Sequence, residues 1–120
     1  MNIELKSITD KGDLRRERLV LLAVQDVNVG HFLVLCAGFS DGQVTTGISS
    51  TFWFPDKDVR AGDLVVLYTK AGTASEKSLD SDGKAHFFYW GRASAQWHST
   101  ERSVVLIHAP DWQGASASEV

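Results

Sequence analysis

The sequence lacks several features that would narrow its function at once. Its 120 residues include one cysteine, Cys36, which excludes an intramolecular disulfide. The place of Cys36 in the apolar run 32–37 predicts a small buried side chain. Residues 1–13 contain no apolar stretch of about 7–15 residues, the mark of a secretory signal, and no run approaches the roughly 18 apolar residues of a membrane-spanning helix. We therefore expect a cytoplasmic protein without membrane association.

An excess of positive charge is also missing. Twelve Lys and Arg residues stand against fifteen Asp and Glu, a net charge of −3, whereas nucleic-acid-binding domains tend to have an isoelectric point above about 9. Arg15, Arg16 and Arg18, with Lys11 nearby, form the one basic cluster. Charges of this kind at a strand edge discourage pairing with other chains, and phosphate contact is the alternative explanation. The composition argues against a nucleic-acid partner and leaves weak nucleic-acid binding as a remote alternative.

Complete catalytic and metal-binding motifs are absent as well. Residues 38–42 fit the G-x-S-x-G pattern of a nucleophile elbow, but that motif needs a following helix, and a strand-like segment follows here. Residues 78–83 imitate the start of a calcium loop, but the twelfth position is Tyr89 instead of a bidentate Glu. We expect a protein that is not an enzyme and that holds no metal and no cofactor.

The four histidines have no spacing that marks a zinc site. They are His31, His86, His98 and His108. His86 and His108 alternate with apolar neighbours in their segments, which predicts partly buried, hydrogen-bonded side chains in place of metal ligands.

What the sequence does contain is a series of short apolar segments separated by turn signals. About eight such segments, at this spacing, are typical of β-sandwiches and barrels, and no convincing helix separates them. The segments begin with a short edge-like strand at Ile3 and Leu5, followed by Arg18–Val24, His31–Ala37, Gln43–Ile48, Phe52–Phe54, Leu64–Tyr68, Ala85–Gly91 and Ser103–Ala109. We predict an all-β fold, an antiparallel β-sandwich.

The remaining segments define the domain. Residues 14–18 fit either a strand or a helix, and Ala71–Lys84 is predicted to be a long polar loop. Ser40-Asp41-Gly42 is typical of a hairpin turn. One domain is expected over residues 1–113, with a flexible tail over 114–120.

The centre of the chain resembles the lamin tail domain. Phe52-Trp53-Phe54-Pro55 is similar to a Phe-Pro step of that family, and Val59–Asp63 with Leu64–Thr69 is similar to its turn and following strand. Tyr89-Trp90-Gly91, Trp97 and Val104–Ile107 resemble its later aromatic positions and closing strand. The resemblance implies a stand-alone, immunoglobulin-like sandwich, without a coiled-coil rod, that serves as a binding or attachment module.

Aromatic residues provide the strongest functional signal. Because side chains alternate along a strand, inward-pointing Phe52 and Phe54 would leave Trp53 outward. In the later strand either Phe88 and Trp90 point inward and Phe87 and Tyr89 outward, or the reverse. Trp and Tyr are favoured as interface anchors, although loops that cover the rings would also explain them. The predicted partner-binding residues are Trp53, Tyr89, Trp97, Arg15 and Arg16.

The sequence thus leads to two hypotheses of function. The first is a non-catalytic protein-interaction domain, a small adaptor or inhibitor-like module that uses exposed aromatic and loop surface. The alternative is a structural attachment or assembly module that associates with itself.

Overall fold

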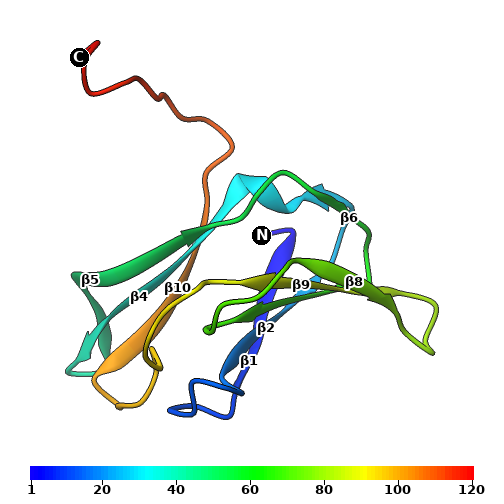
Figure 1. The fold of residues 1–120 in the computed structure, drawn as a ribbon, viewed down its shortest axis with the longest axis horizontal. Helices are drawn as coiled ribbons and strands as arrows, with labels where there is room; N and C mark the ends of the chain where they lie inside the picture. Colours follow the sequence, from blue (N-terminus) through cyan, green and yellow to red (C-terminus); the bar gives the residue numbers. More distant parts are fainter.

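The computed structural model describes residues 1–120, and its regular secondary structure consists of β-strands and one short 3₁₀ turn (Figure 1). The larger sheet has five strands, in the order β1 (Ile3–Thr9), β2 (Arg18–Ala23), β7 (Leu64–Tyr68), β9 (Lys84–Tyr89) and β8 (Ser75–Ser78). The second sheet has three strands, in the order β10 (Arg102–His108), β4 (Phe32–Ser40) and β5 (Gln43–Trp53). A two-stranded ladder, β3 (Val27–Asn28) with β6 (Asp58–Val59), lies beside a single turn of 3₁₀ helix at Val29–His31. The fold is an all-β sandwich, as predicted.

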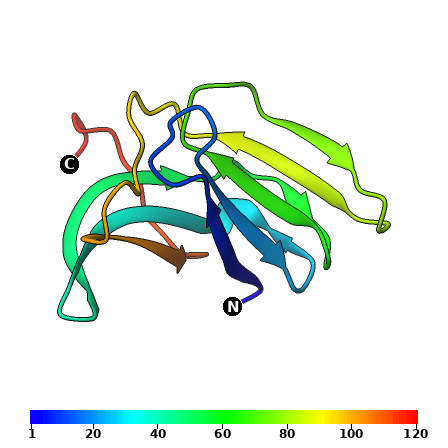
Figure 2. The ribbon, with the colours of Figure 1, turned by 90° about the horizontal axis from the view of Figure 1, so that it is seen from below.

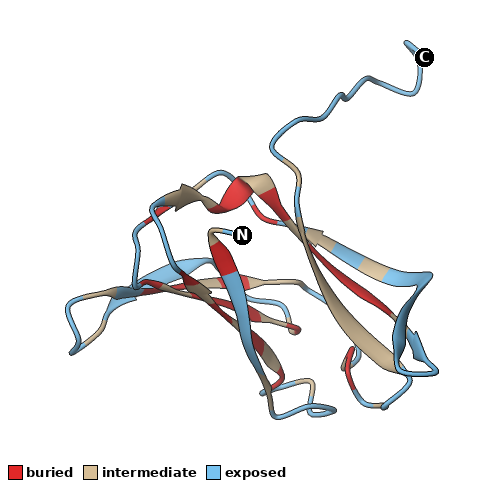
Figure 3. Cartoon of the chain, turned by 180° about the vertical axis from the view of Figure 1, so that it is seen from behind, coloured by how far each residue is buried: buried red, intermediate tan, exposed pale blue.

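The hydrophobic core lies between the two larger sheets. Strand β2 shows the alternation most clearly, because it buries every second side chain, Leu19, Leu21 and Ala23. These residues pack against Phe32 and the other buried apolar side chains of β4 in one cluster of 14 residues. Figure 3 shows buried segments, in red, on strands of both sheets. Cys36 is part of this core and is fully buried, which confirms its predicted role as a small hydrophobic side chain.

Several predicted elements are confirmed. Strand β7 covers the predicted residues 64–68, and Asp41 and Gly42 take positive φ angles of 53° and 74° in the hairpin turn between β4 and β5. Strand β5 differs, because it runs unbroken through the two predicted segments, 43–48 and 52–54, up to Trp53. Strand β5 lies at the edge of the sheet and pairs with β4 through its backbone. Its middle residues can therefore be polar, without the alternation of apolar side chains that marks a half-buried strand.

One strand pair departs from the antiparallel prediction: β7 and β9 are parallel. Parallel neighbours need a crossover connection, and the intervening chain supplies it. Within that chain, β8 forms the sheet edge and pairs antiparallel with β9. The predicted long polar loop 71–84 therefore contains an exposed strand, Ser75–Ser78.

The ambiguous segment 14–18 is neither strand nor helix before Arg18, where β2 begins; residues 14–16 form a turn. At the other end of the chain, the segment after β10 leaves the body of the molecule (Figure 1). Residues 114–120 are exposed and form no strand. No helix in the structure has the length and apolar character needed to cross a membrane.

Candidate functional site

Three loops meet at one end of the larger sheet. They comprise residues 10–18, 68–74 and 89–98, and we call the surface that they form the loop end. Backbone hydrogen bonds join them directly: Thr69 N donates to Glu17 O at 3.1 Å, and Arg92 N donates to Thr69 O at 2.9 Å. Figure 2 shows the turn after β1 beside the segments that follow β7 and β9.

The buried carboxylate of Glu17 holds these loops together. It accepts hydrogen bonds from Gly12 N at 2.9 Å, Thr69 Oγ1 at 2.6 Å, Gln96 N at 2.7 Å and Trp97 N at 3.2 Å. Its side chain is 0% exposed. A buried charge is strongly unfavourable unless it is hydrogen-bonded, and here four donors from all three loops surround it. Glu17 therefore fixes the positions of the loops relative to one another.

Positive charge is concentrated at the loop end. Its three segments hold six of the twelve Lys and Arg residues but only three of the fifteen Asp and Glu, one of which is the buried Glu17. The six basic residues are Lys11, Arg15, Arg16, Arg18, Lys70 and Arg92. The remainder of the chain is correspondingly acidic. The net charge of −3 is therefore unevenly distributed: the loop end is positive and the remainder of the protein is negative.

Tyr68 and Tyr89 form a parallel pair beside these cations. Their ring centroids lie 5.3 Å apart with an interplanar angle of 10°. Lys70 Nζ lies 5.0 Å and Arg18 Cζ 5.8 Å from the Tyr68 ring centroid, within the range of cation–π attraction. The Tyr68 ring and the cations Arg15, Arg16, Arg18 and Lys70 line a surface hollow of about 690 Å³, together with Asp10 and Asp13.

The structure brings together only part of the predicted partner-binding set. Arg15 and Arg16 are exposed and Tyr89 is half-buried, all at the loop end. Trp53 is 45% exposed but lies on the other sheet, where it packs edge-on against Trp112 at 4.8 Å. Trp97 is buried, 4% exposed, and its Nε1 donates to Ser103 O. Its ring belongs to the core, so including Trp97 in an exposed binding set is wrong in this structure.

The predicted alternation of the aromatic strands is confirmed. Phe54 and Phe88 are buried, and Trp53 between its neighbours points outward. Phe87 and Tyr89 lie on the outer face of the larger sheet and are half-buried.

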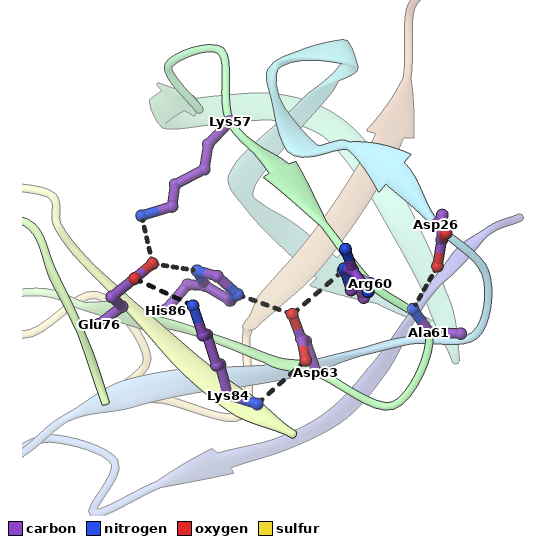
Figure 4. Close-up of polar contacts among 8 residues, drawn as sticks. All are labelled: Asp26, Lys57, Arg60, Ala61, Asp63, Glu76, Lys84 and His86. Atoms are coloured by element: carbon purple, nitrogen blue, oxygen red, sulfur yellow. Dashed lines mark hydrogen bonds and ion pairs between the residues drawn. The ribbon is translucent and has the colours of Figure 1, made fainter. Parts of the chain in front are cut away.

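A second polar cluster surrounds His86, on the face of β9 that points toward the core (Figure 4). His86 Nε2 lies 2.8 Å from Asp63 Oδ2 at the start of β7, and His86 Nδ1 lies 3.5 Å from Glu76 Oε2 on β8. Glu76 is also paired with Lys57 Nζ at 2.9 Å and with Lys84 Nζ at 3.3 Å. The cluster links the edge strand β8 to the interior of the sheet.

Asp63 is the fixed member of this cluster. Burial alone would raise the pKa of its carboxyl group, but hydrogen bonds from His86 and from the backbone amides of Arg60 and Lys84 outweigh that effect and lower the pKa. Pairing with Lys57 and Lys84 likewise lowers the pKa of Glu76. Because an ionised Asp63 can only accept, His86 donates through Nε2.

His86 Nδ1 is buried and forms no hydrogen bond. The nearest charged atom is the Glu76 carboxylate, another acceptor. No Ser, Thr or Cys side chain is hydrogen-bonded to His86. The Asp63–His86 pair is a polar link between the start of β7 and β9.

The other histidines lie elsewhere. The rings of His31 and His108 have centroids 6.4 Å apart, and His108 stacks on Phe32 at 4.7 Å. The prediction of a partly buried, hydrogen-bonded side chain is confirmed for His86 but is wrong for His108, which is exposed at the end of an edge strand. No three His, Cys, Asp or Glu side chains come together in a group that could hold a metal ion.

Two residues that organise these sites were not predicted from the sequence. Glu17 follows two arginines in a polar segment, and Asp63 belongs to a Gly-Asp turn, so each is typical of solvent-exposed positions. Comparison with models of known protein families and with curated proteins gives no match. The geometry of the loop end and of the His86 cluster is therefore the basis for a functional assignment.

Proposed function

We propose that the chain is a non-catalytic protein-interaction domain that binds its partner with the loop end. The observation that carries the proposal is the junction made by Glu17, which turns three loops into one fixed surface. Loops held on a rigid scaffold are the usual location of binding residues, and a fixed surface loses little conformational freedom when it binds.

The side chains at the loop end suit such a role. Exposed Arg15 and Arg16 flank the half-buried Tyr68–Tyr89 pair, and Arg and Tyr are the residue types most often found as interface anchors. The Arg15 and Arg16 side chains form no hydrogen bond or ion pair within the protein. A small adaptor or an inhibitor-like module fits this description.

Three further expectations stay part of the proposal. The resemblance to the lamin tail domain, with its immunoglobulin-like strand arrangement, supports a binding or attachment module. A single buried cysteine fits a cytoplasmic location. The absence of a nucleophile at the Asp63–His86 pair favours a role without catalysis.

Site-specific photo-crosslinking in the native cells tests the proposal. A photoreactive residue placed at Ala93, which is exposed at the loop end, should give a protein adduct of defined mass. The matched control is Ser81, exposed in the turn that precedes β9, at the opposite end of that strand. An adduct at Ala93 and none at Ser81 supports the proposal. Adducts at Ser81 alone, or at neither position, would overturn it.

Self-association is the second candidate function, and Trp53 is the observation that favours it. The exposed Trp53–Trp112 pair lies on the smaller sheet, away from the loop end. Light scattering during size-exclusion chromatography would show an oligomer that Trp112→Ala converts to a monomer if this face is the interface. A monomer at all concentrations would exclude it.

A further inference from the structure

We propose that the loop end binds an acidic peptide segment of a protein partner, with the hollow beside Tyr68 receiving its carboxylates. This inference rests on the proposed function and names the chemistry of the partner. Arg15, Arg16 and Lys70 line the hollow, and none of their side chains forms a hydrogen bond or an ion pair within the protein. Three cations without acidic partners form a surface that an anionic ligand complements.

The cations nearest the ring are held in place before any ligand arrives. Lys70 Nζ lies over the Tyr68 ring. Arg18 lies near the same ring while its NH1 atom donates to Asp10 Oδ2 at 3.0 Å and to the backbone oxygen of Arg16 at 2.8 Å. The hydrogen bond from Arg18 to Arg16 O also restrains the turn that contains Arg15 and Arg16. A ligand therefore meets Arg18 and Lys70 in positions that are already restricted, which lowers the entropy lost on binding.

The same geometry disfavours a nucleic acid. Bases bind proteins by stacking on free aromatic faces, but the Tyr68 ring is already in contact with Tyr89, Arg18 and Lys70. The backbone of Gly72 packs against the Tyr89 ring so closely that a β-carbon at residue 72 would collide with it. Little ring surface is left for a base.

The charge of the surface outside the loop end also favours a peptide over a nucleic acid. Twelve of the fifteen acidic residues lie in the remainder of the chain, against six basic ones. A long polyanion would extend past the loop end and meet this negative surface, whereas a short acidic peptide would contact the basic region alone. Asp10 and Asp13 also line the hollow, and their carboxylates favour a peptide because its backbone amides and neutral side chains can lie beside them.

Fluorescence anisotropy with defined probes tests the inference. The probes are a labelled twelve-residue peptide of alternating Glu and Gly, the same peptide with Gln in place of Glu, and a labelled dT12 oligonucleotide. We expect binding of the Glu peptide, at least about tenfold weaker binding of the Gln peptide, and loss of most binding in about 0.5 M salt.

The double variant R15E/R16E should weaken binding of the Glu peptide by about tenfold or more. Its matched control is K6E/K77E, which changes the net charge by the same amount at two exposed lysines, in β1 and β8, outside the loop end. Circular dichroism of both variants checks that they fold, and K70E provides a third, single-charge variant.

The possible outcomes are distinct. Equal weakening by R15E/R16E and K6E/K77E would mean that only net charge matters and would overturn the inference. Tighter binding of dT12 than of the Glu peptide would assign the surface to nucleic acid and would overturn it too. If no probe binds but crosslinking at Ala93 still captures a protein, the acidic chemistry is wrong and the interaction domain stands; if Ala93 also gives no adduct, both fail.

Discussion

Glu17 and Thr69 are 52 residues apart in the sequence, yet the Thr69 hydroxyl donates to the Glu17 carboxylate at 2.6 Å, and both side chains are fully buried. This contact joins the start of β2 to the end of β7. The Glu17 carboxylate also accepts hydrogen bonds from Gln96 N and Trp97 N, which connects these two strands to the loop after β9. This one carboxylate thus accepts hydrogen bonds from all three segments of the loop end.

Replacing the carboxylate should therefore be costly. We expect Glu17→Ala to lower the free energy of unfolding by about 3 kcal/mol, because buried donors lose their acceptor. Glu17→Gln keeps the shape and one acceptor oxygen and should cost less. Urea unfolding monitored by tryptophan fluorescence measures both. A loss below about 0.5 kcal/mol for Glu17→Ala would mean that the loops are held by other contacts.

Replacing Trp97 or Trp112 with Ala should change the stability of the domain by different amounts. Trp97 is 4% exposed and Trp112 is 60% exposed. We expect Trp97→Ala to destabilise the domain by about 3–5 kcal/mol, since it leaves a cavity in the core. Trp112→Ala should stay within about 0.5 kcal/mol. Similar values for the two variants would contradict the placement of Trp97 in the core.

Stability should fall in acid, and Asp63 should account for part of the loss. The pKa of Asp63 in the folded protein lies below its ordinary value of 3.8. The stabilisation it provides is therefore complete above that value and is lost as the pH falls through the lowered pKa of the folded state. In urea unfolding at pH 7, 5 and 3, the difference between the wild type and Asp63→Asn should shrink toward pH 3.

Two controls accompany this pH series. Glu76→Gln should show the same trend with a smaller amplitude, because Glu76 is more exposed and solvent screens its pairs with Lys57 and Lys84. A difference between the wild type and Asp63→Asn that is constant from pH 7 to pH 3 would refute the role assigned to the ionised Asp63.

Gly72 offers a test of the tyrosine pair. A methyl group at residue 72 would collide with the Tyr89 ring, so Gly72→Ala should displace the 68–74 loop and destabilise the domain by about 1–3 kcal/mol. Gly47→Ala is the matched control, because an added methyl there meets only Thr45 Oγ1 at 3.6 Å, an ordinary contact. Equal melting temperatures for the two variants would show that Tyr89 does not pack on this loop as described.

Local patterns predicted much of the fold. The bounds of strand β7 could be predicted to the residue, because Leu64–Tyr68 is a continuous apolar run between Gly62 and Lys70. Strand β8 could not, because its four residues are all polar and exposed and show no apolar alternation. The parallel pairing of β7 with β9 joins segments that are distant in the sequence, so it could not be predicted from the pattern of either segment alone.

The loop end could be predicted only in its parts. Arg15, Arg16 and Tyr89 were recognised as candidate binding residues, since a basic cluster and an aromatic run are visible in the sequence. Their common location depends on Glu17, whose donors come from residues 12, 69, 96 and 97. Burial of Trp97 has the same cause, because its segment is drawn onto Glu17 and against the core.

The central claim is that the loop end is the binding surface of the domain. An NMR titration of ¹⁵N-labelled protein with the twelve-residue Glu-Gly peptide tests it most directly. We predict that amide shifts concentrate in residues 10–18, 68–74 and 89–98 and leave the 79–83 turn unchanged. Shifts centred on Trp53 and Trp112, or spread evenly over the chain, would contradict the account.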